Sequence, residues 1–172
     1  MMTEPPARPA PGPPPIAAMP GASVDAVRAL ARASRHLERA FPELNLAHYR
    51  VLAAIASGDQ RASRIAEKLA LGKPTVSASV DSLCQRGLLL RAEVVGDQRA
   101  AALRLTPAGA QLLARADAAM AAWVEDVCRR TPDAARVLQS LAWVGQAIEQ
   151  IAAAQHTASR KTQTGAGRAS SN

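Results

Sequence analysis

The chain has 172 residues and a formal net charge of +7, and only 2% of its residues are aromatic. This length suits one domain that buries its core without disulfides or a structural metal. The charge suits a polyanionic partner, whereas the shortage of aromatic side chains argues against a stacking platform for single-stranded nucleic acid. The two cysteines and three histidines are scattered, which argues against a disulfide framework or a spaced zinc site, so we expect no metal and no cofactor.

The N-terminal segment holds eight of the 12 prolines within its first twenty residues. Because proline lacks a backbone N–H, residues 1–21 are predicted to form a disordered or polyproline-like arm. The arm has no basic run followed by an apolar core, and no stretch of the chain approaches the roughly 20 apolar residues that span a bilayer. We therefore expect a soluble, cytoplasmic protein in which Cys84 and Cys128 are inert apolar residues.

A first helix is predicted over residues 22–42. A seam of mostly apolar residues recurs at spacings of three and four, which places these residues on one face of the helix. Four arginines lie along another face. The seam comprises Val27, Leu30, Ser34, Leu37 and Phe41, and the arginine row comprises Arg28, Arg32, Arg35 and Arg39. Such a row is typical of a solvated face, although it could also approach DNA or an acidic partner.

Three shorter helices and a hairpin are predicted between residues 44 and 106. Asn45 and Ser63 are expected to cap the first two helices, and a third helix begins near Lys73–Pro74 and ends at Gly87. Residues 87–106 then read as two short apolar strands around the polar tip Gly96-Asp97-Gln98-Arg99. A helix-turn-helix followed by a hairpin is the element order of a winged helix, so we predict a mainly α (α+β) fold of that class.

Two long helices are predicted over residues 107–129 and 132–154, each opened by a Thr-Pro pair. Their a/d-like stripes are Leu112, Ala116, Met120, Trp123 and Val127 on the first, and Val137, Leu141, Val144, Ile148 and Ile151 on the second. A small winged helix cannot cover both stripes, so residues 22–42 and 107–155 are predicted to form a dimerisation layer. The alternative is a monomeric domain that buries both stripes internally. In either case residues 22–155 form one domain, and residues 156–172 are predicted to be a disordered tail.

The helix that begins at Lys73 is the candidate DNA reader. By helical periodicity its inward face carries Val76, Val80 and Leu83, which leaves the other faces free to enter a major groove. A lysine at its start would contact phosphate, hydroxyls would meet base edges, and an alanine would touch a thymine methyl. The predicted contacts are Lys73, Thr75, Ser77, Ala78 and Ser82. Thr75 and Ser77 could instead only satisfy the first turn of the helix.

The hairpin tip carries the second predicted contact. Arg99 is expected to enter the narrow minor groove of A/T-rich DNA, where groove width is read. Asp97, two residues earlier, is expected to hold the Arg99 side chain extended. A Gly-Asp turn followed by an arginine is also ordinary hairpin chemistry, so this prediction depends on the helices upstream.

Six motifs occur in one order along residues 44–109. They are Leu44–Tyr49, the L-A-x-x-L-like Ile65–Leu69, K-P-T-V-S at Lys73–Ser77, R-G-L-[LIV]-x-R at Arg86–Arg91, D-x-R at Asp97–Arg99 and L-T-x-x-G at Leu105–Gly109. In this order they resemble the multiple-antibiotic-resistance regulator (MarR) family of bacterial winged-helix transcription factors. The flanking helices resemble the dimerisation layer of that family, so the likeness covers about residues 22–155. The chain departs from the family pattern at four positions. Gly72 stands where the family often has a serine, and Ala78, Ser82 and Gln98 stand where many members have an arginine.

The resemblance implies a homodimer on a pseudo-palindromic site in double-stranded DNA, with recognition helices in successive major grooves and wings in the flanking minor grooves. It also implies repression that is relieved by a small phenolic or other amphipathic effector, bound between the helical layer and the DNA-binding lobe. An effector pocket at this place could be lined by His36, Arg39, Tyr49 and Trp123. Alternatively, each of these four side chains only packs in the fold or lies on the surface.

The sequence therefore predicts a sequence-specific DNA-binding transcriptional regulator, acting as a repressor. The alternative is a winged-helix protein-interaction module without specific DNA binding, in which the reading helix packs on a partner protein. An enzyme is not expected, because the chain shows no Ser/His/Asp or Cys/His constellation, no glycine-rich phosphate loop and no paired carboxylates with a plausible cleft.

Overall fold

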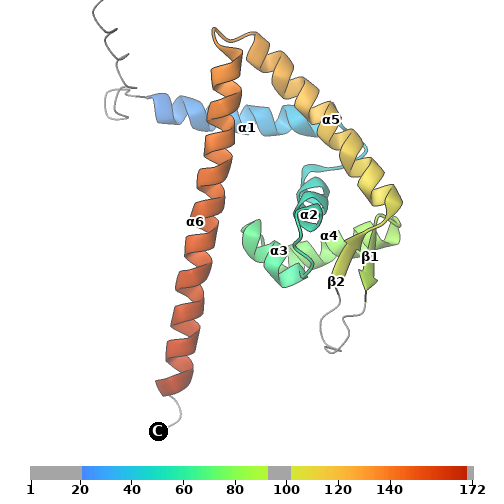
Figure 1. The fold of residues 1–172 in the computed structure, drawn as a ribbon, viewed down its shortest axis with the longest axis vertical. Helices are drawn as coiled ribbons and strands as arrows, with labels where there is room; N and C mark the ends of the chain where they lie inside the picture. The colour runs from blue at the N-terminus through green and yellow to red at the C-terminus, as the bar shows by residue number, and fades with distance from the viewer. Residues whose placement is uncertain (1–20, 93–101, 170–172) are drawn as a thin grey trace, which may run out of the picture. The chain divides into compact units, whose positions relative to one another are not determined.

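The computed structural model describes residues 21–92 and 102–169, with residues 155–169 given by their backbone alone (Figure 1). The elements in chain order are α1 (Ala22–Ala40), α2 (Leu46–Ala56), α3 (Ala62–Lys68), α4 (Lys73–Gln85), β1 (Leu89–Ala92), β2 (Ala102–Leu105), α5 (Pro107–Arg129) and α6 (Ala134–Ala169). They divide into two compact units, Met1–His36 and Leu37–Asn172, where the sequence predicted one domain over residues 22–155. The arm predicted for residues 1–21 lies outside the described residues, apart from Gly21.

The division at His36 falls within α1 and follows from the burial of this helix. None of its side chains is buried, and Val24, Val27 and Leu30 are exposed. The predicted apolar seam is therefore present over residues 22–36 but uncovered, so burial contributes little to fixing this part of the helix. Beyond the division, Phe41 is buried in the core of the second unit.

The core of the second unit gathers apolar side chains from α2, α3, α4, the hairpin and α5. Asn45 caps α2 as predicted, because its side-chain oxygen accepts a hydrogen bond from the His48 backbone N–H at 2.7 Å. The predicted inward face of α4 is confirmed: Val76 and Val80 are 1% exposed and Leu83 is fully buried. Gly87 ends this helical region at φ +67, the left-handed conformation expected there.

The start of α3 differs from the prediction. The helix begins after Arg61, which makes no side-chain capping bond, and the predicted cap Ser63 lies inside the helix. The backbone before α3 is held instead by the hairpin, because the Leu103 N–H donates to the Gln60 carbonyl at 2.7 Å. A long-range backbone bond thus fixes the chain at the point where a hydroxyl was expected to do so.

The hairpin and α5 meet at a close backbone approach. β1 and β2 pair antiparallel, with Leu89 opposite Leu105 and Ala92 opposite Ala102. The Thr106 hydroxyl caps α5 by accepting from the Gly109 N–H at 3.0 Å, and it donates to the Gly87 carbonyl at 2.7 Å. A Cβ on Gly109 would overlap the Leu88 carbonyl oxygen. The first turn of α5 can therefore lie against the base of the hairpin only because residue 109 is glycine.

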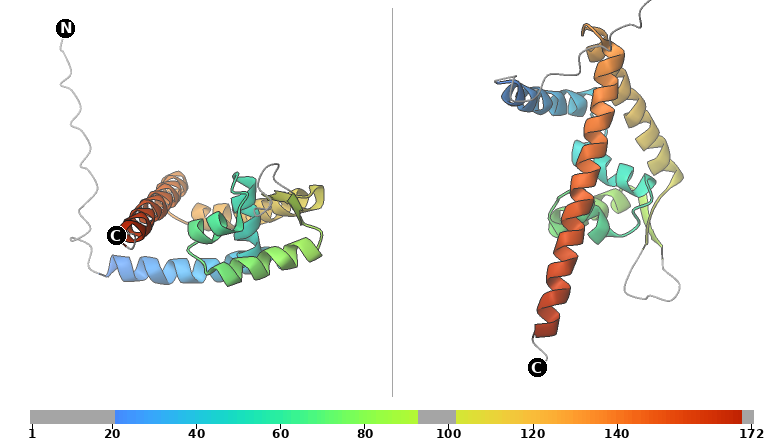
Figure 2. Two further views of the ribbon diagram at one scale, coloured as in Figure 1. Left: turned by 90° about the horizontal axis from the view of Figure 1, so that it is seen from below. Right: turned by 60° about the vertical axis from the view of Figure 1, so that its left-hand side comes forward.

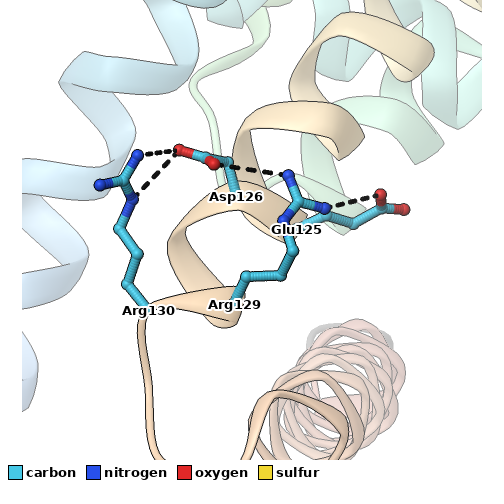
Figure 3. A network of polar contacts seen from close by, with 4 residues as sticks. All are labelled: Glu125, Asp126, Arg129 and Arg130. Atoms are coloured by element: carbon cyan, nitrogen blue, oxygen red, sulfur yellow. Dashed lines mark hydrogen bonds and ion pairs between the residues drawn. The ribbon is translucent and has the colours of Figure 1, made fainter.

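The end of α5 carries a compact charge network (Figure 3). Arg130 donates to Asp126 at 2.9 Å, and Arg129 lies between Asp126 and Glu125. The hydrogen bond from Arg130 is the main cause that lowers the pKa of Asp126. These arginines are thus neutralised locally, within the last turn before the chain reverses into α6.

The helix α6 lies beside α3 and runs as one long helix (Figure 2). It continues to Ala169, beyond the predicted end near residue 154, so the backbone of residues 155–169 is helical where the sequence predicted a disordered tail. The segment contains no proline, and eight of its 15 residues are alanine, arginine, lysine or glutamine, which have high helix propensity; glycine appears only at Gly165 and Gly167.

Much of the apolar stripe on α6 is not covered within the chain. Its exposed large apolar side chains are Leu138, Leu141, Trp143, Val144, Ile148 and Ile151. Within the described residues, these side chains of the α6 stripe are therefore accessible to solvent or to a partner. None of the helices in the described ranges is long and apolar enough to span a membrane.

Candidate nucleic-acid interface

The turn between α3 and α4 brings the candidate reading helix to the surface. Ala70 adopts φ +50, a left-handed conformation in a residue other than glycine, and the Leu71 N–H closes the turn on the Ala66 carbonyl at 2.9 Å. Gly72 is the N-cap of α4 and, as a glycine, makes no side-chain capping bond. The first N–H groups of α4 are thus oriented outward at an uncapped helix terminus, which is a favourable place for a phosphate.

The predicted contacts on α4 share one accessible side of the helix. Those fully exposed are Lys73, Thr75, Ser77 and Ala78, and Ser82 is half-buried. The core-facing valines lie between them in sequence and behind them in space. All five side chains thus lie outside the core on one helix, and their role in DNA binding stays a prediction.

An ion pair joins the reading helix to the hairpin. Arg91 on β1 donates to the Asp81 carboxylate on α4 at 2.5 Å, and both side chains are about half exposed. The pair neutralises the acidic residue on the exposed side of α4, where a free carboxylate would repel phosphate. It also fixes the first strand of the hairpin against the helix.

A second set of contacts holds the far end of α4. Arg86 donates to the Glu43 backbone carbonyl at 3.0 Å, while the Glu43 carboxylate pairs with Arg115 on α5. The Arg115 guanidinium lies 5.4 Å from the centre of the Phe41 ring, within reach of a cation–π interaction. The loop before α2 therefore connects the end of α4 to α5. Burial, and then the Arg86 charge, lower the pKa of His48 on the same side.

The hairpin tip falls in the segment 93–101, which is outside the described residues. Asp97 and Arg99 both belong to this segment, so their predicted roles stay predictions. The flanking strands are described: Ala92 and Ala102 face each other across the ladder, and Leu90 pairs with Arg104. The two ends of the tip segment thus start from adjacent positions on a paired hairpin.

Among the four side chains considered for an effector pocket, Tyr49 makes a contact between distant elements. Its hydroxyl donates to the Asp117 carboxylate at 2.8 Å and so joins α2 to α5. Burial, and then this bond, raise the pKa of Tyr49 to about 12. His36 and Arg39 are partly or fully exposed, and Trp123 is half-buried. Tyr49 thus has a structural partner, which the sequence did not identify.

The sequence did not single out the charged partners in these contacts. Arg91 appeared only as the last residue of a motif, and Arg115 and Asp117 were not named at all. The one signal available for Arg91 was its place at the start of the hairpin, ten residues after Asp81. Arg115 pairs with Glu43, 72 positions away, and Asp117 pairs with Tyr49, 68 positions away. No local sequence pattern predicts such pairs.

Comparisons with known proteins agree with this geometry. The sequence model of the MarR family matches residues 43–100, and no curated protein sequence matches the chain. A MarR-family transcriptional regulator from Rhodococcus sp. RHA1 has a solved structure with a TM-score of 0.64 and 21% identity, and the match covers 74% of this chain and 94% of that one.

Two further solved structures concern one repressor. The transcriptional repressor CouR bound to a 23-mer DNA duplex is 25% identical at a TM-score of 0.63, with 76% of this chain and 93% of that chain covered. CouR from Rhodococcus jostii RHA1 bound to p-coumaroyl-CoA is 21% identical at a TM-score of 0.61, with coverage of 72% and 87%. Together these matches confirm the predicted winged-helix fold.

Proposed function

Because residues 43–100 match the sequence model of the MarR family, we propose that the chain is a winged-helix regulator of this family, which represses transcription as a homodimer on a pseudo-palindromic operator in double-stranded DNA. The observation that carries the proposal is the accessible side of α4. It presents Lys73 at an uncapped helix terminus, followed by small polar and apolar side chains and no bulky group. Such a surface can approach base edges in a major groove closely.

In this proposal the contacts of α4 divide by chemistry. Lys73 and the first N–H groups of the helix bind phosphate, which positions the protein. Thr75, Ser77 and Ser82 offer hydroxyls to base edges, and Ala78 contacts a thymine methyl. The Asp81–Arg91 pair keeps the helix face from repelling the DNA backbone and holds the hairpin beside it.

The hairpin supplies the minor-groove contact. We propose that Arg99 enters the minor groove beside the site read by α4 and that Asp97 orients it. The support is the paired hairpin that carries the segment and the ion pair that ties β1 to α4. Because α4 offers few charged readers, Arg99 is expected to contribute a large share of the affinity.

The homodimer is supported by the uncovered apolar surface of α6. Ile148 is 61% exposed and Ile151 is 58% exposed, which is costly in water unless a partner covers them. Near the start of α6, a shallow and almost wholly apolar groove of about 400 Å³ is lined in part by Val137, Leu141 and Val144. A second copy of the chain offers the same apolar stripe, so a two-fold pairing would cover both.

We also propose that a small phenolic or other amphipathic effector relieves repression. The support is a relative, CouR, whose structures include one bound to DNA and one bound to p-coumaroyl-CoA. In this chain the Tyr49–Asp117 bond joins α2 to α5. An effector whose hydroxyl competes for Asp117 would change how the reading lobe is held against α5, which is one way to shift the DNA-binding population.

The test is selection of bound sequences from random duplex DNA by the full chain, followed by affinity measurements across a range of salt. Arg99→Ala should weaken binding most where A/T-rich sequence flanks the selected site, with helical content unchanged. Lys73→Ala should weaken binding evenly across sequences and reduce the slope of log affinity against log salt by about 0.9 for each chain, which is about 1.8 for the dimer. Lys68→Ala is the matched control, because Lys68 on α3 is paired with Asp59 at 2.8 Å and has no predicted role in DNA binding.

The outcomes separate the two functions considered. Selection of a two-fold symmetric site with salt-dependent affinity supports the regulator. Absence of any salt-dependent duplex binding by the unmodified chain would leave the protein-interaction module as the better account. If Arg99→Ala binds the selected site as tightly as the unmodified chain at fixed salt, the proposed minor-groove contact is wrong.

A further inference from the structure

The C-terminal part of α6 has no apolar face to bury. The apolar stripe of the helix ends at Ile151, and residues 152–169 contain no large apolar side chain, although the backbone remains helical to Ala169. At 1.5 Å per residue the helix continues for about 27 Å beyond Ile151. Pairing of apolar stripes between two copies therefore does not explain this segment.

What the segment does carry is positive charge. No acidic residue follows Glu149, whereas Arg160, Lys161 and Arg168 lie within the helical range. Positions 161 and 168 are seven residues apart and share one helix face, with position 160 beside it. Elsewhere in the described chain several arginines are paired with carboxylates on the same helix, as at the end of α5. After Glu149, α6 offers no such partner in its own sequence.

The helix takes this charge toward the DNA-binding side of its unit. α6 lies beside α3, and both Figure 1 and the right-hand view of Figure 2 show its C-terminal part running past α3. It does so at the end of the unit toward which β1 points. In the proposed function, a duplex bound by α4 and the hairpin would lie on that side, so the basic segment would be near the same polyanion.

We propose that residues 156–169 of α6 are a second phosphate-binding segment, which adds a sequence-independent contact to the DNA held by α4 and the hairpin. The inference rests on the proposed function. Phosphate contacts of this kind position a protein without reading sequence, so the segment raises affinity and leaves the preferred site unchanged.

The experiment compares two double variants of the full chain that lose the same charge. R160Q/K161Q removes two positive charges from the proposed segment, and R129Q/R130Q removes two from the end of α5, where carboxylates already pair them. Glutamine keeps a high helix propensity. The operator chosen by selection is titrated with each protein at several salt concentrations, and the slope of log affinity against log salt is compared.

We expect R160Q/K161Q to reduce the slope by about 0.9 for each phosphate that the variant no longer binds, with the ranking of operator sequences unchanged, and R129Q/R130Q to leave the slope as it is. The charge-preserving variant R160K/K161R should keep the original slope, which a purely structural role of these side chains would not predict. If both charge-loss variants change the slope equally, the effect comes from net charge alone. If neither variant changes the slope, the segment does not contribute to DNA binding. Either result overturns the inference. If the unmodified chain shows no salt-dependent duplex binding, the proposed function itself fails.

Discussion

Replacing Gly109 by alanine tests how the hairpin is attached to the rest of the winged helix. An added Cβ would overlap the Leu88 carbonyl oxygen, which is backbone and cannot swing away. The first turn of α5 must therefore move off the base of the hairpin. That movement gives up the Thr106 cap of α5 and two bonds across the contact, from the Thr106 hydroxyl to the Gly87 carbonyl at 2.7 Å and from the Thr106 N–H to the Leu88 carbonyl at 3.1 Å.

The expected cost follows from those three interactions. A lost N-cap costs about 1 kcal/mol, and each lost hydrogen bond costs about 1 kcal/mol. The higher helix propensity of alanine returns about 1 kcal/mol. We expect Gly109→Ala to lower the free energy of unfolding by about 2 kcal/mol, measured by urea denaturation followed by circular dichroism at one protein concentration.

Gly145→Ala is the matched control for this substitution. It also lies in a helix, but none of the described residues comes within 4 Å of the added Cβ. The control should raise the free energy of unfolding by about 0.5–1 kcal/mol through propensity alone. If Gly109→Ala is as stable as this control, the close approach at Leu88 does not limit the packing of α5 on the hairpin, and the reasoning fails.

Two further predictions concern charged contacts. Tyr49 is the only tyrosine, so ultraviolet titration of its phenolate should give a pKa of about 12, and Asp117→Asn should bring this pKa closer to 10. Because the folded pKa is raised, the stability from the Tyr49 bond is present below pH 10 and is lost as pH rises toward 12; an unchanged titration in Asp117→Asn would refute the bond. Arg91→Gln should weaken duplex binding about two- to fivefold, as expected for a half-exposed pair, and Asp81→Asn in that background should restore part of the loss. A double-mutant cycle without coupling would show that the Asp81–Arg91 pair does not affect DNA binding.

Local signals made α4 predictable. The spacing of Val76, Val80 and Leu83 determines which side of the helix is buried, and that in turn determines which side remains for DNA. Asn45 caps the start of one helix and Gly87 ends another, and each acts on residues within four positions in the sequence. Their roles can therefore be predicted without knowledge of the tertiary structure. For this reason the predicted contacts on α4 lie on its accessible side in the structure.

Contacts between distant elements could not be predicted in the same way. Tyr49 meets Asp117 only because α2 and α5 cross at one particular place, and sequence periodicity carries no information on that crossing. The start of α3 depends on a backbone bond from the hairpin for the same reason. The end of α6 was misjudged because its apolar stripe stops at Ile151, whereas backbone propensity sustains the helix further.

The distribution of charge determines which part of the protein supplies affinity for DNA. Within α4 the only cationic residue is Lys73, and the one acidic residue, Asp81, is neutralised by Arg91. In the proposed function, the reading helix would therefore contribute about one phosphate contact per chain from its side chains, and its small residues would distinguish bases. If the protein binds its operator with the steep salt dependence typical of this class, most of that dependence must come from outside α4. The proposed sources are Arg99 on the hairpin and the basic end of α6, and the salt slopes of the variants at these two places measure their shares separately.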